Sequence, residues 1–496
     1  MKKSSLSKII CLFFFVAVII SGCSFTGLDK YSQNLNEYNI NLQFNDENKS
    51  LSGTQTVNYI NSTDIVLTNV DFHLYPNAFK RQETTQKVVS DFNYDRAYPN
   101  GFDSGYIDIR EVKVKNKDAT YSFCESENSI ISVELGEKLY PEERIEIKFS
   151  YEIKIPNIHH RFGYGDNTIN IGNFYPIACI YEDGGFVHDG YHYNGDPFYS
   201  QMANYNVEIT YPSKYEIGSS GECVKTEENA GCITKNFEAI VVRDFAFVLS
   251  EKFEVQKSKY EDTSIYYMFY KDEEPAKTLQ LIEDALKTFN NLIGEYPYST
   301  LTVVQSNFIH GGMEYSNIVL ISDEVEITSE YYNVIVHEIA HQWFYNIIGN
   351  NEVSEAWLDE GLTEYVTAMF YDLNEGYGTT YDDIVANMLN SYLLFVDVYE
   401  DVFGGLDTSM NRSLQEFGSE YEYTYMVYVK SVLMLDTLRD VLGDANFCLG
   451  LKTYYENNKF KIATKEHFIR DFSKVSSTDI KGLVNSWVEG KVQIKN

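Results

Sequence analysis

The hydrophobic pattern of this chain changes its period about halfway along, and this change constrains the fold more than any other feature. From about residue 31 to 255, apolar and polar residues tend to alternate, most clearly over 145–155, where every odd position is apolar. Alternation places one face of a strand on a core and the other in water. Weaker versions at 205–212 and 244–250, with turn clusters between them, predict a β-sandwich or a large twisted sheet.

The second half of the chain follows a helical period instead. Residues 276–294 carry apolar side chains at near-helical spacing, and mostly helical patterns continue to the end. Two short β runs interrupt them, at 301–304 and 318–321. A chain of 496 residues exceeds one comfortable hydrophobic core. We therefore expect a multidomain protein, with a β domain over 34–255 followed by an α+β, mainly helical domain over 256–496.

The N-terminus is typical of a targeting segment. Three lysines precede an apolar run over 9–20, which is too short to cross a bilayer but suits a signal peptide. The run ends in small residues and Cys23, which resembles a bacterial lipoprotein signal. In that interpretation residues 1–22 are removed, Cys23 is acylated, and 23–33 form a linker, so that the protein is anchored to the cell membrane by lipid alone. The alternative is ordinary secretory cleavage beside an incidental cysteine. Both alternatives place the protein outside the cytoplasm.

Composition argues against a nucleic-acid-binding protein and against a disulfide-rich protein. The formal net charge is −33, so the chain repels nucleic acid, and we expect no nucleic-acid partner. Seven cysteines without a CxxC motif do not form a dense disulfide framework. Cys223 and Cys232 could close a hairpin by a disulfide, or both could be free thiols. The sequence does not predict an oligomeric state.

The strongest chemical signal is "VHEIAHQWF", which places His337 and His341 four residues apart. On a helix both imidazoles lie on one face and can share one zinc ion. Ser329 is a plausible N-cap of this helix. Two solvated helix histidines are the alternative. His188 and His192 form a second pair, but they sit in a Gly-rich loop without a convincing third ligand, and we expect a structural or surface role for them.

Glu360, nineteen residues beyond His341, is the expected third ligand. The glycine and asparagines at 349–351 should end the first helix, and Ser354 should cap a second helix that returns Glu360 to the histidines. Two imidazoles and one carboxylate leave an open position for water, as in catalytic zinc sites. Glu364, one turn later, could orient a ligand or could be a solvated carboxylate.

Glu338 lies beside the first histidine and can act as a general base. It can take a proton from the attacking water and pass it to the leaving amine. The pattern therefore predicts metal-assisted hydrolysis with one Zn²⁺ per chain.

These motifs resemble the aminopeptidase N family of zinc metallopeptidases, whose pattern is HExxH, eighteen residues, then Glu. The resemblance extends to "YPYSTLTVV", "HGGMEY", "WLDEGLTEY" and "VYVKSVLML". It implies a saddle-like N-terminal β domain, a thermolysin-like catalytic domain, zinc, and peptide substrates with a free N-terminus. We expect no counterpart of the large C-terminal helical domain that longer members have.

The resemblance also implies residue roles. "HGGMEY" stands where the family binds substrate, so Gly311, Gly312 and Met313 would contact the peptide, and Glu314 would bind its α-amino group. The physical logic agrees, because a partly desolvated carboxylate near the metal favours an ammonium. Tyr315 replaces the family's Asn. A Gly-Gly turn with an exposed Glu314 is the structural alternative.

"VYVKS" stands where the family has Tyr-x-Lys-Gly, which implies that Tyr428 stabilises the oxyanion of the reaction. Ser431 replaces the family's Gly, and several tyrosines lie nearby. Two other functions stay open. One is an endopeptidase in which Glu314 binds no amine, and the other is a surface lipoprotein that binds a partner without turnover.

Overall fold

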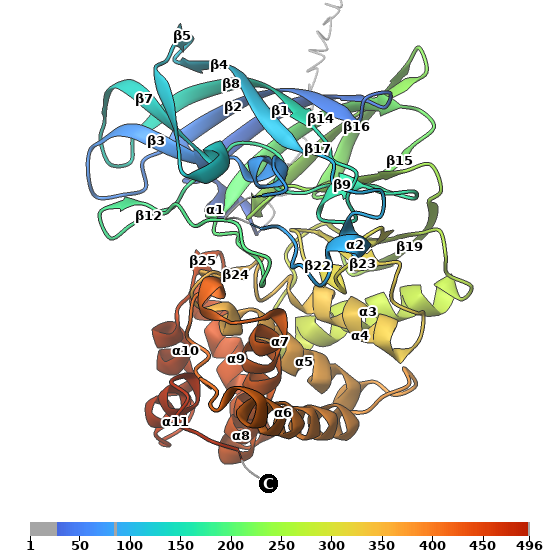
Figure 1. Cartoon of the computed structure of the whole chain (residues 1–496), viewed down its shortest axis with the longest axis vertical. Helices are drawn as coiled ribbons and strands as arrows, with labels where there is room; N and C mark the ends of the chain where they lie inside the picture. The colour runs from blue at the N-terminus through green and yellow to red at the C-terminus, as the bar shows by residue number, and fades with distance from the viewer. Residues whose placement is uncertain (1–26, 84–86, 495–496) are drawn as a thin grey trace, which may run out of the picture.

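A computed structural model describes residues 27–83 and 87–494. Cys23 and the predicted signal peptide lie outside these residues. The described chain forms a β-rich part followed by a mainly helical part, which are stacked along the long axis of the molecule in Figure 1. Among the described residues, no helix is both long and apolar enough to span a membrane.

The β-rich part consists of one large sheet and smaller sheets beneath it. The large sheet has eight strands in the order β16 (Glu222–Asn229), β17 (Cys232–Val242), β14 (Ala203–Pro212), β1 (Asn36–Asn45), β2 (Ser50–Ile60), β8 (Arg144–Lys154), β4 (Tyr106–Val114) and β5 (Lys117–Asp118). One four-stranded sheet runs β15 (Glu216–Ser219), β18 (Phe247–Ser250), β10 (Ile169–Ile171) and β9 (Phe162–Tyr164). The other runs β11 (Ile177–Ala178), β3 (Leu67–His73), β7 (Ile130–Leu139) and β6 (Tyr121–Cys124). A two-stranded ribbon joins β12 (Tyr181–Glu182) to β13 (Gly185–Phe186).

Strand β8 shows why the alternating pattern gives this architecture. Its residues alternate between buried and partly buried along the whole strand. One face therefore packs on the smaller sheets and the other meets solvent. β8 pairs antiparallel with β2 and with β4. The expected β fold of the first half is confirmed.

The second part begins with a five-stranded sheet, in the order β19 (Glu254–Tyr260), β20 (Thr263–Phe269), β21 (Thr300–Ser306), β23 (Ile318–Ser322) and β22 (Gly312–Met313). The two short β runs expected in this half are β21 and β23, and both are fully buried. Strand β22 pairs antiparallel with β23 at the sheet edge. This edge strand carries part of the "HGGMEY" motif.

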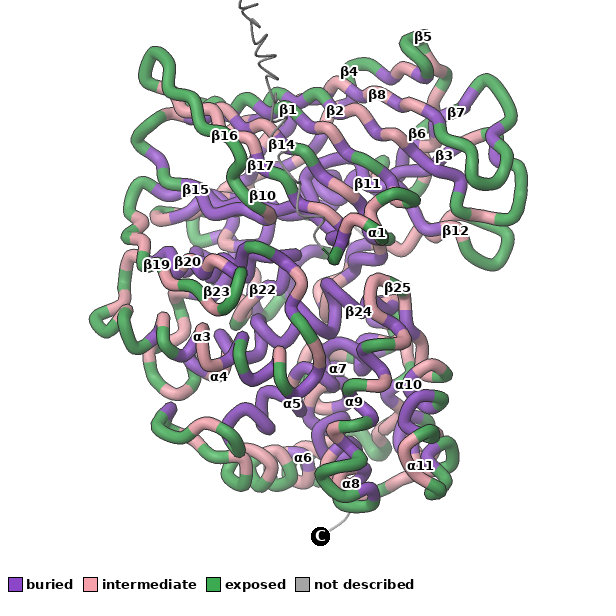
Figure 2. Tube along the Cα trace, turned by 180° about the vertical axis from the view of Figure 1, so that it is seen from behind, coloured by how far each residue is buried: buried purple, intermediate pink, exposed green. Residues whose placement is uncertain are grey.

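Helices form the rest of the second part. The longer ones are α3 (Pro275–Leu292), α4 (Ser329–Ala340), α5 (Glu360–Leu373), α6 (Tyr381–Phe403), α8 (Lys430–Leu442), α9 (Asp444–Asn458), α10 (Lys465–Phe472) and α11 (Ile480–Val488). Shorter turns are α1 (Asp29–Ser32), α2 (Tyr94–Ala97), α7 (Glu420–Thr424), η1 (Tyr75–Phe79), η2 (Ser126–Asn128), η3 (Ala356–Leu358), η4 (Leu414–Glu416) and the π-helical η5 (Tyr425–Val429). A parallel bridge links β24 (Ile348–Gly349) to β25 (Lys461–Ile462). Figure 2 shows that α4 and α5 are mostly buried, whereas α6 is mostly half-buried or exposed.

The ends of α4 and α5 differ from the expectation. Thr328, not Ser329, is the N-cap of α4, because its side chain accepts a hydrogen bond from the Glu330 amide. Helix α4 stops at Ala340, before the predicted break at 349–351. Ser354 caps no helix, since α5 begins only at Glu360. The connection is thus a long irregular segment, and buried side chains such as Trp343 fix its course.

The alternative of a disulfide between Cys223 and Cys232 is not realised, because both thiols are free. Cys223 lies opposite Phe237 in the β16–β17 hairpin, while Cys232 lies opposite Asn229 at its turn. The two cysteines are therefore several residue pairs apart along the ladder. A disulfide requires two residues that face each other closely.

Candidate metal centre and active site

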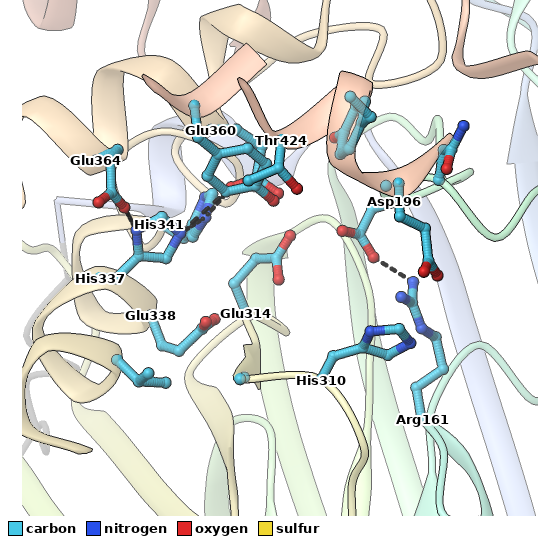
Figure 3. Close-up of a pocket in the computed structure, with 18 of the residues that line it drawn as sticks. Arg161, Asp196, His310, Glu314, His337, Glu338, His341, Glu360, Glu364 and Thr424 are labelled. Atoms are coloured by element: carbon cyan, nitrogen blue, oxygen red, sulfur yellow. Dashed lines mark hydrogen bonds and ion pairs between the residues drawn. The ribbon is translucent and has the colours of Figure 1, made fainter. Parts of the chain in front are cut away.

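His337, His341 and Glu360 converge on one point in the structure (Figure 3). The Nε2 atoms of the two histidines lie 3.1 Å apart. Glu360 Oε2 lies 3.3 Å from His337 Nε2 and 3.1 Å from His341 Nε2. Helix α4 carries His337, its C-cap residue His341 follows one turn later, and α5 packs against α4 with Glu360 in its first turn.

This triangle fits one zinc ion. Zinc bonds of about 2.0–2.1 Å in a tetrahedral site place neighbouring ligand atoms about 3.3 Å apart. The observed separations of 3.1–3.3 Å match that edge. Moreover, two imidazole nitrogens and a carboxylate oxygen at this separation are all electron-pair donors, which repel unless a cation lies between them.

A second layer of contacts orients the histidines. Glu364 Oε2 lies 2.7 Å from His337 Nδ1, one helical turn from Glu360 on α5. The carbonyl oxygen of Phe344 lies 2.9 Å from His341 Nδ1. Both contacts fix the outer ring nitrogen, which leaves each Nε2 directed at the shared point. Glu364 is not a freely solvated carboxylate, since its side chain is only 13 % exposed.

Glu338 lies next to the ligands with a buried carboxylate. It is 5 % exposed, and its Oε2 has no hydrogen-bond partner. Burial raises the pKa of Glu338 to about 7, although His337 and His341 oppose the rise. Such a carboxylate can both accept and return a proton near neutral pH.

Glycine at position 312 makes room for Glu338. A Cβ atom built on Gly312 would collide with Glu338 Oε1. Any larger residue there would displace the carboxylate. By contrast, a Cβ on Gly311 would meet only Val334 at 3.5 Å, an ordinary contact.

The "HGGMEY" segment divides its side chains between two environments. Side chains alternate along a strand, so Gly312 and Glu314 share one face and Met313 takes the other. Gly311, Gly312 and Glu314 line a cavity of about 390 Å³ together with the metal triad. Met313 and Tyr315 are fully buried in the core and do not line it. Met313 is therefore placed away from the predicted substrate contact.

Glu314 points into this cavity (Figure 3). It is 3 % exposed, and its Oε1 has no partner. Burial, with the nearby carboxylates of Asp196 and Glu338, raises the pKa of Glu314 well above its ordinary value. The alternative of a Gly-Gly turn with an exposed Glu314 is thus wrong.

Tyr423 and Tyr428 both line the cavity, and of the clustered tyrosines Tyr428 is the one that stacks on a ligand. Its ring stacks on His337 with 6.0 Å between centroids, and it lines the cavity. Burial raises the pKa of its hydroxyl well above the usual value, with a contribution from Glu360, so it stays a proton donor. Tyr425 instead stacks on Phe395, and Tyr421 is 60 % exposed. The π-helical turn η5 places Tyr428, and such turns are frequent at functional sites.

Ser431 packs against Gly361, the residue after the third ligand. A Cβ on Gly361 would collide with the Ser431 side chain, so the glycine provides the space that serine needs. Replacing a glycine by serine in this motif is therefore compatible with close packing of α5 on α8.

The β-rich part also contributes to the cavity, through residues that the sequence did not single out. Tyr193, Asn194, Gly195 and Asp196 line it, and Asp196 forms a buried ion pair with Arg161. Oxygen atoms of Asp196, Glu314 and Glu360 lie within 4.8 Å of one another. These residues carry no motif, and only the fold brings them to the zinc ligands. The polar stretch "HYNGD" was the one available signal.

The histidines of the same loop have structural contacts, as expected. His188 Nε2 lies 2.8 Å from Asp71 Oδ2. His192 Nδ1 accepts a hydrogen bond from the Asn194 backbone. Among the described residues, neither histidine belongs to a group of ligands that could hold a metal.

Comparisons with known proteins point to the same class of enzyme. Residues 273–487 match the family described as "Peptidase family M1 domain". Aminopeptidase N of Lactococcus lactis subsp. lactis is 24% identical over 225 residues, which are 43% of this chain and 25% of the relative. Glutamyl aminopeptidase of Rattus norvegicus is 28% identical over 163 residues, 31% of this chain and 16% of the relative. The match therefore spans about a quarter or less of these relatives' length.

Solved structures extend the likeness to nearly the whole chain. A two-domain M1 zinc metallopeptidase variant bound to L-arginine superposes with a TM-score of 0.64 at 16% identity, covering 92% of this chain and 94% of that one. The M1 zinc metallopeptidase of Deinococcus radiodurans gives a TM-score of 0.63 at 16% identity, with 93% and 95% covered. The expected architecture, a β-rich part followed by a helical zinc-binding part, is confirmed.

Proposed function

Because the chain belongs to the aminopeptidase N family of zinc metallopeptidases, also described as peptidase family M1, we propose that it releases N-terminal residues from peptides. The observation that supports an aminopeptidase over an endopeptidase is Glu314. This buried carboxylate has an unpartnered oxygen within the same cavity as the triad. A substrate ammonium would satisfy it, and only a free N-terminus supplies that group at a fixed distance from the scissile bond.

Each residue of the cavity then has one task. When bound by His337, His341 and Glu360, zinc would polarise the scissile carbonyl and make a water molecule acidic enough to lose a proton near neutral pH. Glu338 accepts that proton and delivers it to the leaving nitrogen as the peptide bond breaks. The products are a free amino acid and a peptide shortened by one residue.

Tyr428 and Glu314 hold the two ends of the reacting residue. Tyr428 donates a hydrogen bond to the carbonyl oxygen as negative charge develops on it. Glu314 holds the ammonium on the other side, which places the first peptide bond beside Glu338. Glu364 holds the His337 ring in the orientation that directs its Nε2 at the metal position.

One peptide in two versions, free and N-acetylated, tests this function. The zinc-loaded protein from Ser24 onwards is incubated with each, and products are followed by mass spectrometry, with Glu338→Gln as the blank. We expect stepwise loss of N-terminal residues from the free peptide alone. Internal cleavage of both versions would instead identify an endopeptidase.

We further propose that the protein works outside the cytoplasm, tethered to the cell membrane through a lipid on Cys23. The n-region lysines, the short apolar run and the small residues before Cys23 support this. Expressed with its leader in a bacterium, the chain should enter the membrane fraction and incorporate a labelled fatty acid. Cys23→Ser should abolish both, and labelling that survives this change would contradict the proposal.

A further inference from the structure

Glu420 is a cavity carboxylate that neither the metal nor the proposed chemistry uses. It is the first residue of α7 and lines the cavity of the metal triad. Its Oε2 accepts hydrogen bonds from Ser90 Oγ at 2.9 Å and Asn93 Nδ2 at 3.1 Å. Both donors are neutral and come from the β-rich part, so they fix the carboxylate without neutralising its charge.

No cation of the described chain compensates Glu420. Within the described residues, no Lys, Arg or His nitrogen lies within 4.0 Å of its carboxylate. The nearest arginine of this network, Arg96, donates to Asn93 Oδ1 and pairs with Glu324 instead. The other cavity carboxylates have a positive partner or a role: Asp196 with Arg161, Glu364 with His337, Glu360 with both histidines, Glu314 for the amine and Glu338 for the proton.

The position of Glu420 separates it from the α-amine site. Glu420, Tyr423, Thr424 and Tyr428 follow one another on the cavity side of α7 and η5. Glu420 therefore lies about two helical turns from Tyr428, which is beside the ligands. The Glu314 carboxylate, by contrast, lies within 4.8 Å of Glu360. A group bound at Glu420 is thus the far end of a long side chain, not the amine.

The cavity lining also includes two buried residues with unsatisfied polar atoms. The hydroxyl of Tyr423, 5 % exposed, and Oδ1 of Asn194, 1 % exposed, have no hydrogen-bond partner. Both can accept hydrogen bonds. The Glu420 carboxylate is likewise an acceptor only, which suits an ammonium or guanidinium group, because such a group carries several N–H donors and no acceptor.

We propose that the cavity selects peptides whose first residue is lysine or arginine, with Glu420 as the specificity-determining carboxylate. This inference rests on the proposed function only in that the residue bound is the N-terminal one. Glu314 takes the α-ammonium and Glu420 takes the side-chain cation. The charge that remains uncompensated in the free protein is thereby neutralised by the substrate.

Three matched peptides that differ only in their first residue, lysine, norleucine or glutamate, test this directly. The wild type should prefer lysine over norleucine by about tenfold or more in kcat/KM. Glu420→Gln, which keeps an acceptor for Ser90 and Asn93, should bring that ratio close to one. Glu400→Gln, which removes an exposed carboxylate outside the cavity, should leave the ratio as it is. An unchanged ratio in Glu420→Gln would overturn the proposal.

Binding provides a readout that does not depend on turnover. Titration calorimetry on zinc-loaded Glu338→Gln compares lysinamide with norleucinamide, with and without Glu420→Gln added. Tighter lysinamide binding that is lost with Glu420 supports the inference even if no peptide is cleaved, in which case the proposed function alone fails. Equal affinities for the two amides would overturn the inference alone.

Discussion

At the scale of single residues, Gly312 is where the backbone of β22 comes closest to Glu338. Gly312→Ala should leave the fold intact but displace the Glu338 carboxylate, because the added methyl group collides with its Oε1. We expect kcat to fall by about 100-fold, the usual loss when a general base is misplaced. Steady-state kinetics, with circular dichroism for folding, measures this. Gly311→Ala is the control, and equal activity of both variants would contradict the described geometry.

Tyr428 offers a second test, because its proposed role depends on the hydroxyl group alone. Tyr428→Phe keeps the ring on His337 but removes the donor to the developing oxyanion. We expect kcat to fall by about 100-fold with little change in KM, as for an interaction made mainly in the transition state. Tyr425→Phe, on the ring that stacks against Phe395, should be neutral. If the Tyr425 variant loses activity instead, the assignment belongs one turn earlier.

At the scale of elements, α5 combines a metal ligand with the residue that orients another ligand. Glu360 and Glu364 lie one turn apart, so a single helix sets both contacts to the histidines of α4. Glu364→Gln should weaken zinc affinity by about 10- to 100-fold, because His337 Nδ1 loses a charged partner. Competition with a chromogenic chelator measures this. Glu375→Gln, an exposed carboxylate just after α5, should leave zinc affinity unchanged. If both variants bind zinc with equal affinity, Glu364 does not contribute to zinc binding.

The elements also show which parts of the structure were predictable from sequence. Strand β8 and helix α3 follow from local periodicity, because one buried face determines each of them. The zinc ligands follow from spacing along helices. The end of α4 did not follow, since the segment between Ala340 and Glu360 is fixed by buried contacts distant in sequence.

The β-rich wall of the cavity escaped prediction for a related reason. Arg161, Asp196 and Asn93 reach the site only because two parts of the chain pack together. Neither residue spacing nor composition predicts contacts between segments so far apart in the sequence. The role of Glu420 could not be predicted for another reason. A single carboxylate on a short helix forms no sequence motif, and its partners Ser90 and Asn93 are known only from the structure.

At the scale of the whole molecule, Arg243 and Asp244 join the two parts. Arg243 donates to the carbonyl oxygens of Ser200 at 3.0 Å and Lys461 at 2.7 Å. Asp244 Oδ1 accepts from the Ser316 amide at 2.9 Å, and its Oδ2 accepts from the Tyr345 hydroxyl. This buried junction holds the β-rich wall of the cavity against the helical part.

The junction should make stability depend on pH. Burial raises the pKa of Asp244 from 3.8 to about 6, although Tyr345 and Ser316 lower it. The folded state therefore takes up a proton more readily than the unfolded state, so this residue adds stability below about pH 4 that is lost as pH rises through about 6. Between pH 7 and pH 5, the free energy of unfolding of the wild type should rise by about 1 kcal/mol relative to Asp244→Asn. Denaturant titrations of both proteins measure this difference, and a difference independent of pH would contradict the raised pKa.

The central claim is that Glu314 binds the substrate ammonium next to the zinc triad. The most direct test compares a peptide with its desamino analogue, which lacks only that ammonium, in the wild type and in Glu314→Gln. The wild type should prefer the amine by about 100-fold in kcat/KM, as expected for a buried ion pair, and Glu314→Gln should lose nearly all of this preference. If both proteins show the same ratio, Glu314 does not bind the amine, and the central claim is wrong.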